Sequence, residues 1–277
     1  MKLCYQVATP DVVRTPLVTA FQGELGTVFA KLADLGYDGV ELMVRDPSCL
    51  NKAGISKLAA INNLEVAMVC TGEVYGQDHL SFIDLQPEIR KAALVRMKSC
   101  IDFAAYFGAQ VNIGRLRGQY YPDVPPEVSN RWALDAFKQI TEWGEQSEVI
   151  SALEPINILQ SNFINSTQEG MKWVDKVGSP YFRMMLDLFH MHIEDQDLLE
   201  SFNISKGYYS YVHLADSNRR IPGNCKLNFP AIIKQLYELN YEGWLGVEIF
   251  QLPDQEIASS ESIGYLNPIL RELNTTK

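Results

Sequence analysis

Short apolar runs alternate with longer amphipathic segments along the whole chain. The apolar runs predict eight strands, at residues 3–7, 39–44, 64–70, 110–114, 149–155, 182–188, 209–215 and 244–250. The amphipathic segments have helical spacing and predict eight helices, at residues 24–35, 54–63, 88–107, 125–146, 167–177, 196–202, 229–239 and 256–273. Strict alternation of strands and helices is typical of a parallel sheet that helices cover.

Eight strand–helix units in 277 residues predict the α/β class and, within it, a (β/α)₈ TIM barrel, a fold that takes about 250 residues. An open doubly wound sheet is the alternative that the same alternation permits. No linker or low-complexity tract divides the chain, so we expect residues 1–277 to form a single TIM-barrel domain. Side chains at the C-terminal ends of its strands would then meet at one mouth.

Acidic or imidazole side chains lie at the ends of four successive predicted strands. They are Glu154, Asp187, His213 and Glu248, at intervals of 33, 26 and 35 residues. One strand–helix unit takes roughly 30 residues, so the four lie at equivalent places. A buried acid costs free energy unless it is paired or bound to a metal. Any one of these acids could instead be exposed at a strand end or form a buried ion pair. The four together predict a divalent-metal site that suits Mn²⁺, Mg²⁺ or Co²⁺ and does not exclude Zn²⁺.

The charge and cysteine content limit the compartment and partners of the chain. A formal net charge of −10 argues against a nucleic-acid partner. No apolar run approaches the roughly 20 residues of a membrane span, and residues 1–5 do not have the pattern of a signal peptide, so we expect no membrane partner. The cysteines form no CxxC pair and fit the reduced thiols of a cytoplasmic protein; they are Cys4, Cys49, Cys70, Cys100 and Cys225.

Four segments carry a family resemblance. They read EPIN at residues 154–157, LDLFHMHIE at 186–194, HLADSNRRIPG at 213–223 and GVE at 246–248. From about residue 37 to 250 the chain resembles the sugar phosphate isomerase/epimerase family of xylose-isomerase-like TIM barrels, which includes ketose 3-epimerases, hydroxypyruvate isomerases and inosose isomerases. The resemblance implies that the four strand-end side chains hold one metal ion, usually Mn²⁺. It also implies that Glu154 and Glu248 transfer the protons, and that His190 and Arg219 contact the substrate.

The implied activity is isomerisation or epimerisation of a keto sugar or sugar phosphate. A proton next to the carbonyl is removed, and the metal-bound enediolate is reprotonated. Two alternatives stay open: a metal-dependent dehydratase or lyase acting on a polyol ketone of the inosose type, and a non-catalytic sugar-binding barrel. The endonuclease IV type of DNA-repair enzyme shares the superfamily, but the 4 histidines of this chain are too few for its three-metal site. The pattern leaves the oligomeric state open, a homo-oligomer included.

Three features bear on the substrate. Six residues after Glu154, where ketose 3-epimerases usually carry a glutamate that contacts the sugar, this chain has Gln160. Arg115 and Arg117 lie between two glycines directly after a predicted strand, and this spacing predicts a site for a phosphate or carboxylate, with a solvated basic loop as the alternative. Glu41 has a mouth position on the second predicted strand, where we expect it to bind sugar hydroxyls or pair with an arginine.

Overall fold

The computed structural model describes residues 1–275, and its strands close into one parallel barrel in which each strand neighbours the next. The strands are β1 (Lys2–Ala8), β2 (Gly39–Met43), β3 (Glu65–Cys70), β4 (Gln110–Ile113), β5 (Ser151–Leu153), β6 (Phe182–Asp187), β7 (Tyr209–Leu214) and β8 (Trp244–Val247). The barrel closes where β1 pairs with β8, from Lys2 opposite Trp244 to Tyr5 opposite Val247. The TIM barrel is therefore confirmed, and the open sheet is excluded.

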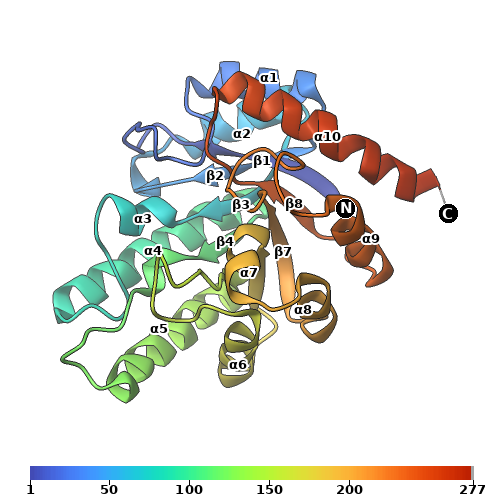
Figure 1. Cartoon of the computed structure of the whole chain (residues 1–277). Helices are drawn as coiled ribbons and strands as arrows, with labels where there is room; N and C mark the ends of the chain where they lie inside the picture. The colour runs from blue at the N-terminus through green and yellow to red at the C-terminus, as the bar shows by residue number, and fades with distance from the viewer. Residues whose placement is uncertain (276–277) are drawn as a thin grey trace.

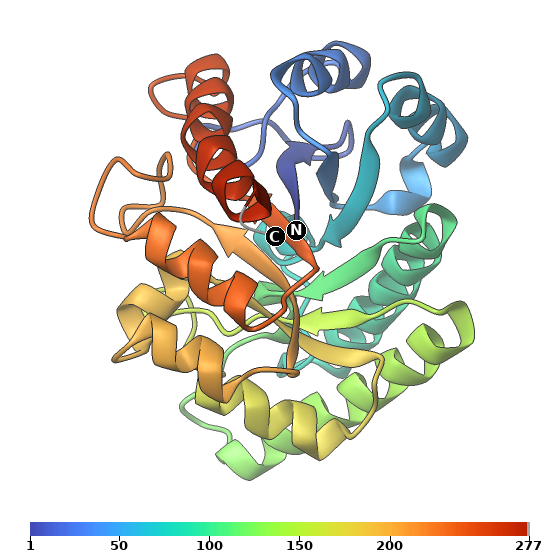
Figure 2. The same cartoon turned by 90° about the vertical axis from the view of Figure 1, so that its right-hand side faces the viewer.

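Helices form an outer ring around the strands (Figures 1 and 2). They are α1 (Leu25–Leu35), α2 (Lys52–Ile61), α3 (Gly72–Gly76), α4 (Pro87–Phe107), α5 (Pro126–Ser147), α6 (Thr167–Val177), α7 (Leu188–Glu194), α8 (Leu198–Ile204), α9 (Phe229–Glu238) and α10 (Gln255–Thr275), with 3₁₀ turns η1 (Pro47–Cys49) and η2 (Arg115–Arg117). Every predicted helix is present, whereas the short α3 and α7 were not predicted. Within residues 1–275, no helix is both long and apolar enough to cross a membrane.

Local sequence signals explain where the helices begin and end. The hydroxyl of Ser166 accepts a hydrogen bond from the backbone N–H of Glu169 and so caps the first turn of α6. The same helix ends at Gly178, whose φ of 70° lies in the left-handed region that glycine adopts without strain. At the barrel mouth, the carboxylate of Asp187 accepts from the N–H of Phe189 and starts α7 directly at the end of β6.

Two apolar layers hold the barrel together. The larger lies between the strands and the ring of helices. The smaller fills the barrel interior, because its members come from five different strands and contact one another; they are Cys4, Ala67, Met68, Ala152, Met185 and Tyr211. Tyr211 is the polar member of this inner layer, and its hydroxyl donates to the carboxylate of Glu41 at 2.7 Å. The inner layer thus supports the polar side chains at the mouth.

Candidate metal centre and substrate pocket

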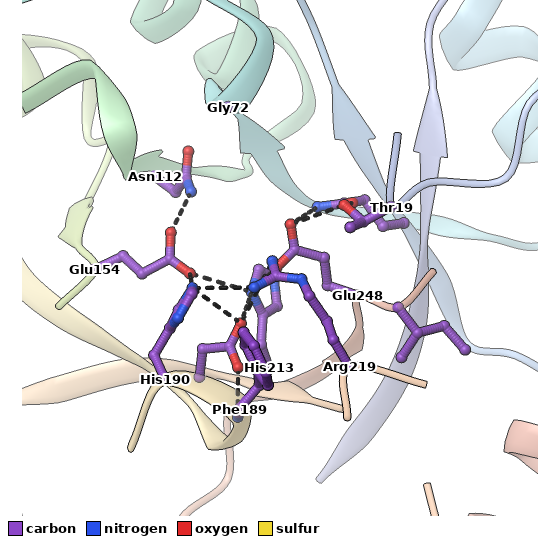
Figure 3. A network of polar contacts seen from close by, with 12 residues as sticks. Thr19, Gly72, Asn112, Glu154, Phe189, His190, His213, Arg219 and Glu248 are labelled. Carbon is purple, nitrogen blue, oxygen red and sulfur yellow. Dashed lines mark hydrogen bonds and ion pairs between the residues drawn. The ribbon is translucent and has the colours of Figure 1, made fainter. Parts of the chain in front are cut away.

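The barrel mouth brings together the four side chains that the strand-end pattern singled out. Glu154 follows β5, Asp187 ends β6, His213 lies near the end of β7, and Glu248 follows β8. All four are buried, and one potential ligand atom from each lies within 4.8 Å of the others. Figure 3 shows Glu154 and Glu248 entering from opposite sides with His213 between them.

The cluster fits a divalent cation on its own geometry. Within the described residues, Asp187 Oδ2 and His213 Nδ1 are buried without a hydrogen-bond partner, which is costly unless something else satisfies them. His213 Nδ1 lies 3.2 Å from Glu248 Oε2 and 3.7 Å from Asp187 Oδ2. Neighbouring ligands of a cation with bonds of ~2.0–2.5 Å lie about 3–3.5 Å apart. Three carboxylates and one imidazole therefore make a suitable ligand set.

The two glutamates have different electrostatic surroundings. Burial raises the pKa of Glu154, and the nearby Glu248 and Asp187 carboxylates raise it further against the opposing effect of His213. Burial acts in the same direction on Glu248, but Arg219 and His213 outweigh it and hold the pKa of Glu248 well below its ordinary value. Arg219 Nη2 donates to Glu248 Oε2 at 2.6 Å. The two carboxylates therefore differ in their affinity for a proton.

Hydrogen bonds from β1, β4 and the segment after β1 orient both glutamates. Asn112 on β4 donates to Glu154 Oε2 at 3.2 Å. Glu248 Oε1 accepts from Thr19 Oγ1 at 3.1 Å and from Gln6 Nε2 on β1 at 3.2 Å. Each carboxylate thus keeps one oxygen tied to the barrel wall, while the other faces the centre.

His190 lies beside Arg219 at the edge of the pocket. Its Nδ1 lies 2.7 Å from the Asn157 side-chain amide and 3.4 Å from the backbone N of Asn157. Burial lowers the pKa of His190 to about 3, so the ring is neutral and carries one proton. Arg219 Nη1, which can only donate, lies 3.1 Å from Nε2. The imidazole and the guanidinium therefore form one polar wall of the cavity.

Arg219 is held in place by the loop after β7. Its backbone has a φ of 56°, an unusual conformation for a residue other than glycine. The buried carboxylate of Asp216 anchors this loop by accepting from five backbone N–H groups, those of Ser217, Gly223, Cys225, Lys226 and Leu227. A buried carboxylate with this many donors makes the loop rigid. The position of the Arg219 guanidinium over Glu248 is thus built into the fold.

A cavity of about 430 Å³ opens above the four side chains, which suits a small ligand. Its lining includes His190, Arg219, Arg115 and the exposed Gln160, together with Glu73. His79 and His192 lie outside this lining. A larger hollow of about 1000 Å³ lies on the outer surface beside α4, but it contains none of the four clustered side chains.

The structure separates the two arginines that were expected to bind an anion together. Arg117 is 0% exposed and lies outside the cavity lining, because its guanidinium donates to three backbone carbonyls, those of Phe163, Gly114 and Ile164, at 2.8, 3.0 and 2.9 Å. Arg117 therefore does not reach the cavity in this structure, where the sequence predicted that it would bind substrate. Arg115 does line the cavity, but its Nη2 lies 3.3 Å from Glu73 Oε1.

Glu41 also has a different environment from the one expected. It is 0% exposed and lies behind His213, whose Nε2 is 2.8 Å from Glu41 Oε2. It therefore neither pairs with an arginine nor lines the cavity.

Sequence reasoning missed the polar partners Gln6, Thr19, Asn112, Asn157 and Asp216. The available signal was a polar residue inside an apolar strand, as Gln6 is in LCYQVA and Asn112 is in QVNI.

Comparison with known proteins agrees with this architecture. The family model described as xylose isomerase-like TIM barrel matches residues 29–269. A probable ketose 3-epimerase of Synechocystis sp. is 30% identical over 246 residues, covering 86% of this chain and 83% of that protein. An L-ribulose 3-epimerase of Mesorhizobium japonicum is 25% identical over 246 residues, covering 87% and 82%.

A solved structure shows the same fold. The apo form of 3-keto-D-glucoside 4-epimerase from E. coli superposes with a TM-score of 0.81 at 21% identity, and the match covers 97% of this chain and 99% of that one. The family match spans most of the chain, from α1 to α10. The chain therefore belongs to the xylose isomerase-like TIM barrel family.

Proposed function

We propose that this protein is a metal-dependent enzyme that epimerises an uncharged keto sugar at a carbon next to the carbonyl. The observation that carries the proposal is the placement of Glu154 and Glu248 on opposite sides of one buried centre. A proton can leave one face of a carbon and return to the other only if a proton carrier stands on each side. Two relatives named above are a probable ketose 3-epimerase and an L-ribulose 3-epimerase, which supports the same chemistry here.

Glu154, Asp187, His213 and Glu248 would hold the cation, for which we infer Mn²⁺ from the ligand set and the family. A divalent cation at this place supplies Lewis acidity to the substrate carbonyl and lowers the cost of negative charge on its oxygen. Glu154 and Glu248 each keep an oxygen directed to the centre, so each can also exchange a proton with a substrate carbon. These two side chains are the proposed catalytic residues.

His190 and Arg219 would bind the substrate oxygens. Both side chains line the cavity and lie 3.1 Å apart, and the guanidinium can donate to an oxygen that gains charge when the proton leaves. Arg219 also holds Glu248 through a 2.6 Å hydrogen bond. It therefore orients one proton carrier while it stabilises the charge that this carrier creates.

The far end of the cavity favours an uncharged sugar over a sugar phosphate. Arg117 donates to backbone carbonyls, and Arg115 is paired with the buried Glu73. A phosphate placed beside Arg115 would meet the Glu73 carboxylate at close range, and like charges repel. Gln160 and Gln119, which also line the cavity, offer neutral amides to sugar hydroxyls.

The proposal is tested with Mn²⁺ and D-fructose, L-ribulose or D-fructose 6-phosphate in D₂O, followed by NMR. We expect deuterium at C3 together with the C3 epimer of the free ketoses. Glu154→Gln and Glu248→Gln should each lower turnover by roughly 10²–10⁴-fold, the usual loss when a general base is removed. Asp187→Asn should abolish Mn²⁺ binding, because its Oδ2 is one of the two unsatisfied atoms at the centre.

Glu65→Gln is the matched control, since Glu65 is an exposed carboxylate at the start of β3 and at the opposite end of the barrel. This variant should keep full activity. Label at C1 with formation of an aldose would replace the proposal with a 1,2-isomerase, and loss of water from a polyol ketone would replace it with a dehydratase. Near-normal rates in both active-site glutamine variants would remove these carboxylates from the mechanism.

A further inference from the structure

We propose that Glu41 is a positioning residue that holds the Nε2–H of His213 and thereby directs Nδ1 of the same ring at the metal. The inference rests on the metal centre proposed above. It assigns a role to a buried carboxylate that neither lines the cavity nor belongs to the four-residue cluster.

The two nitrogens of His213 have opposite environments. Nε2 lies 2.8 Å from Glu41 Oε2, whereas Nδ1 faces Glu248, Asp187 and the centre without a hydrogen bond. A carboxylate can only accept, so Nε2 must carry the proton. The lone pair of a neutral ring then lies on Nδ1, which is the form that a metal ligand needs.

The ring has little freedom to turn away from this arrangement. A Cβ at Gly246 on β8 would lie 2.7 Å from the Tyr211 hydroxyl oxygen and 3.0 Å from His213 Cδ2, so glycine at this place leaves room for both rings. The ring of Tyr211 meets the His213 ring edge-on, with centroids 5.5 Å apart. Packing sets the plane of the imidazole, and the Glu41 hydrogen bond sets which nitrogen faces the metal.

Glu41 is itself held by three donors. Its Oε2 accepts from the Tyr211 hydroxyl at 2.7 Å as well as from His213, and its Oε1 accepts from Gln6 Nε2 at 2.8 Å. Gln6 in turn reaches Glu248 Oε1 at 3.2 Å. Glu41 on β2 and Gln6 on β1 therefore connect His213 to Glu248, although these two strands supply none of the four clustered side chains. A carboxylate behind a ligating histidine fixes its orientation and raises its basicity.

Glu41→Gln is the informative substitution because it preserves the shape of the side chain. The substitution replaces one carboxylate oxygen with an NH₂ group. In one orientation of the amide this NH₂ group faces the donors of His213 and Tyr211, and in the other it faces the donor of Gln6. We expect the Mn²⁺ dissociation constant from titration calorimetry to rise about 10- to 100-fold, the usual cost of losing such a partner. The Nε2–H resonance of His213 in the Mg²⁺-saturated, ¹⁵N-histidine protein should also move from its hydrogen-bonded position. With 4 histidines in the chain, that signal is assigned by comparison with His213→Gln.

Tyr211→Phe is the matched control. It removes a hydrogen bond of similar length from the same carboxylate oxygen and leaves the His213 contact in place. We expect Tyr211→Phe to change the Mn²⁺ affinity by less than a few-fold, with the His213 resonance unmoved.

The outcomes separate this inference from the proposed function. Wild-type affinity and an unmoved His213 resonance in Glu41→Gln would overturn the positioning role while leaving the metal centre intact. Equal losses of affinity in Glu41→Gln and Tyr211→Phe would also overturn it, since both would then report a loosened barrel interior. A wild-type protein that binds no Mn²⁺ would instead refute the metal centre itself.

Discussion

Arg115 and Arg117 lie in one 3₁₀ turn, yet the structure predicts opposite results when each is replaced by methionine. Arg117→Met should lower the free energy of unfolding and leave substrate binding almost unchanged. Arg115→Met should hardly affect stability and should change the Michaelis constant, because Arg115 lines the cavity. Methionine keeps most of the apolar stem of arginine in both cases, so the comparison isolates the guanidinium.

The magnitude for Arg117 follows from its three hydrogen bonds. A hydrogen bond that involves a charged group contributes roughly 1.5–3 kcal/mol. Each carbonyl that Arg117 contacts keeps a second donor, as Ile164 O does from the N–H of Ile156 and Gly114 O from the N–H of Arg117 itself, so the low end of that range applies. Burial also lowers the pKa of Arg117 to about 10, so holding the charge inside has a cost. Three bonds at the low end contribute about 4.5 kcal/mol, and with the cost of the buried charge subtracted we expect a loss of about 1–3 kcal/mol.

Urea denaturation followed by circular dichroism measures the effect, with the slope of the transition checked for constancy. A loss of about 1–3 kcal/mol is a measurable part of the roughly 5–15 kcal/mol that stabilises a typical protein. For Arg115→Met we expect less than about 1 kcal/mol, since its ion pair with Glu73 is partly exposed. A loss below about 1 kcal/mol for Arg117→Met, or a selective loss of affinity for ketose phosphates, would refute the assignment and restore Arg117 as an anion-binding residue.

Three further predictions follow from other contacts. Removal of the proposed metal with EDTA should lower the melting temperature, because a cation at 100 times its dissociation constant stabilises by about 2.7 kcal/mol; calorimetry with and without Mn²⁺ checks this. Glu73→Gln should release Arg115 and raise kcat/KM for a ketose phosphate relative to the free ketose, whereas an unchanged ratio would count against the pairing. Burial raises the pKa of Asp78, but hydrogen bonds from Arg96 and Arg45 outweigh it and lower the pKa below its ordinary value. Asp78 therefore stabilises the fold above its unfolded pKa of about 3.9, and this contribution is lost as pH falls through the folded pKa. Urea titrations of Asp78→Asn should show a deficit of ~1 kcal/mol or less at pH 7 that vanishes in acid.

The fold and the cluster at the barrel mouth could be predicted because both follow from periodic patterns in the sequence. Alternating apolar and amphipathic segments give strands and helices in order, and the strand ends of a parallel barrel share one mouth. The helix at Thr167–Val177 has the predicted bounds, and Asp187 and His213 pair directly across β6 and β7. The short helix α7 escaped prediction because Leu188–Glu194 spans only two turns, too few for a helical period to show.

The direction in which a polar side chain points could not be predicted in the same way. Arg115 and Arg117 have the same residue type and the same loop, and only the folded chain places the Phe163 carbonyl beside one of them. The sequence predicts that Glu41 lies at the barrel mouth, but it cannot show that its partner is His213, which lies 172 positions away. Such partners are brought together by barrel closure, on which local sequence carries no information.

The seam between β1 and β8 has a consequence for the order of folding. It pairs Lys2 with Trp244, and the Gln6–Glu248 hydrogen bond crosses the same seam between residues 242 positions apart. Contacts of such long range form late, because the entropy of closing the intervening chain must first be overcome. We therefore expect the proposed metal centre to be complete only after the barrel has closed, with its interactions absent from the folding transition state. A cation bound at the proposed centre should then slow unfolding without hastening folding, so it would stabilise the closed barrel kinetically.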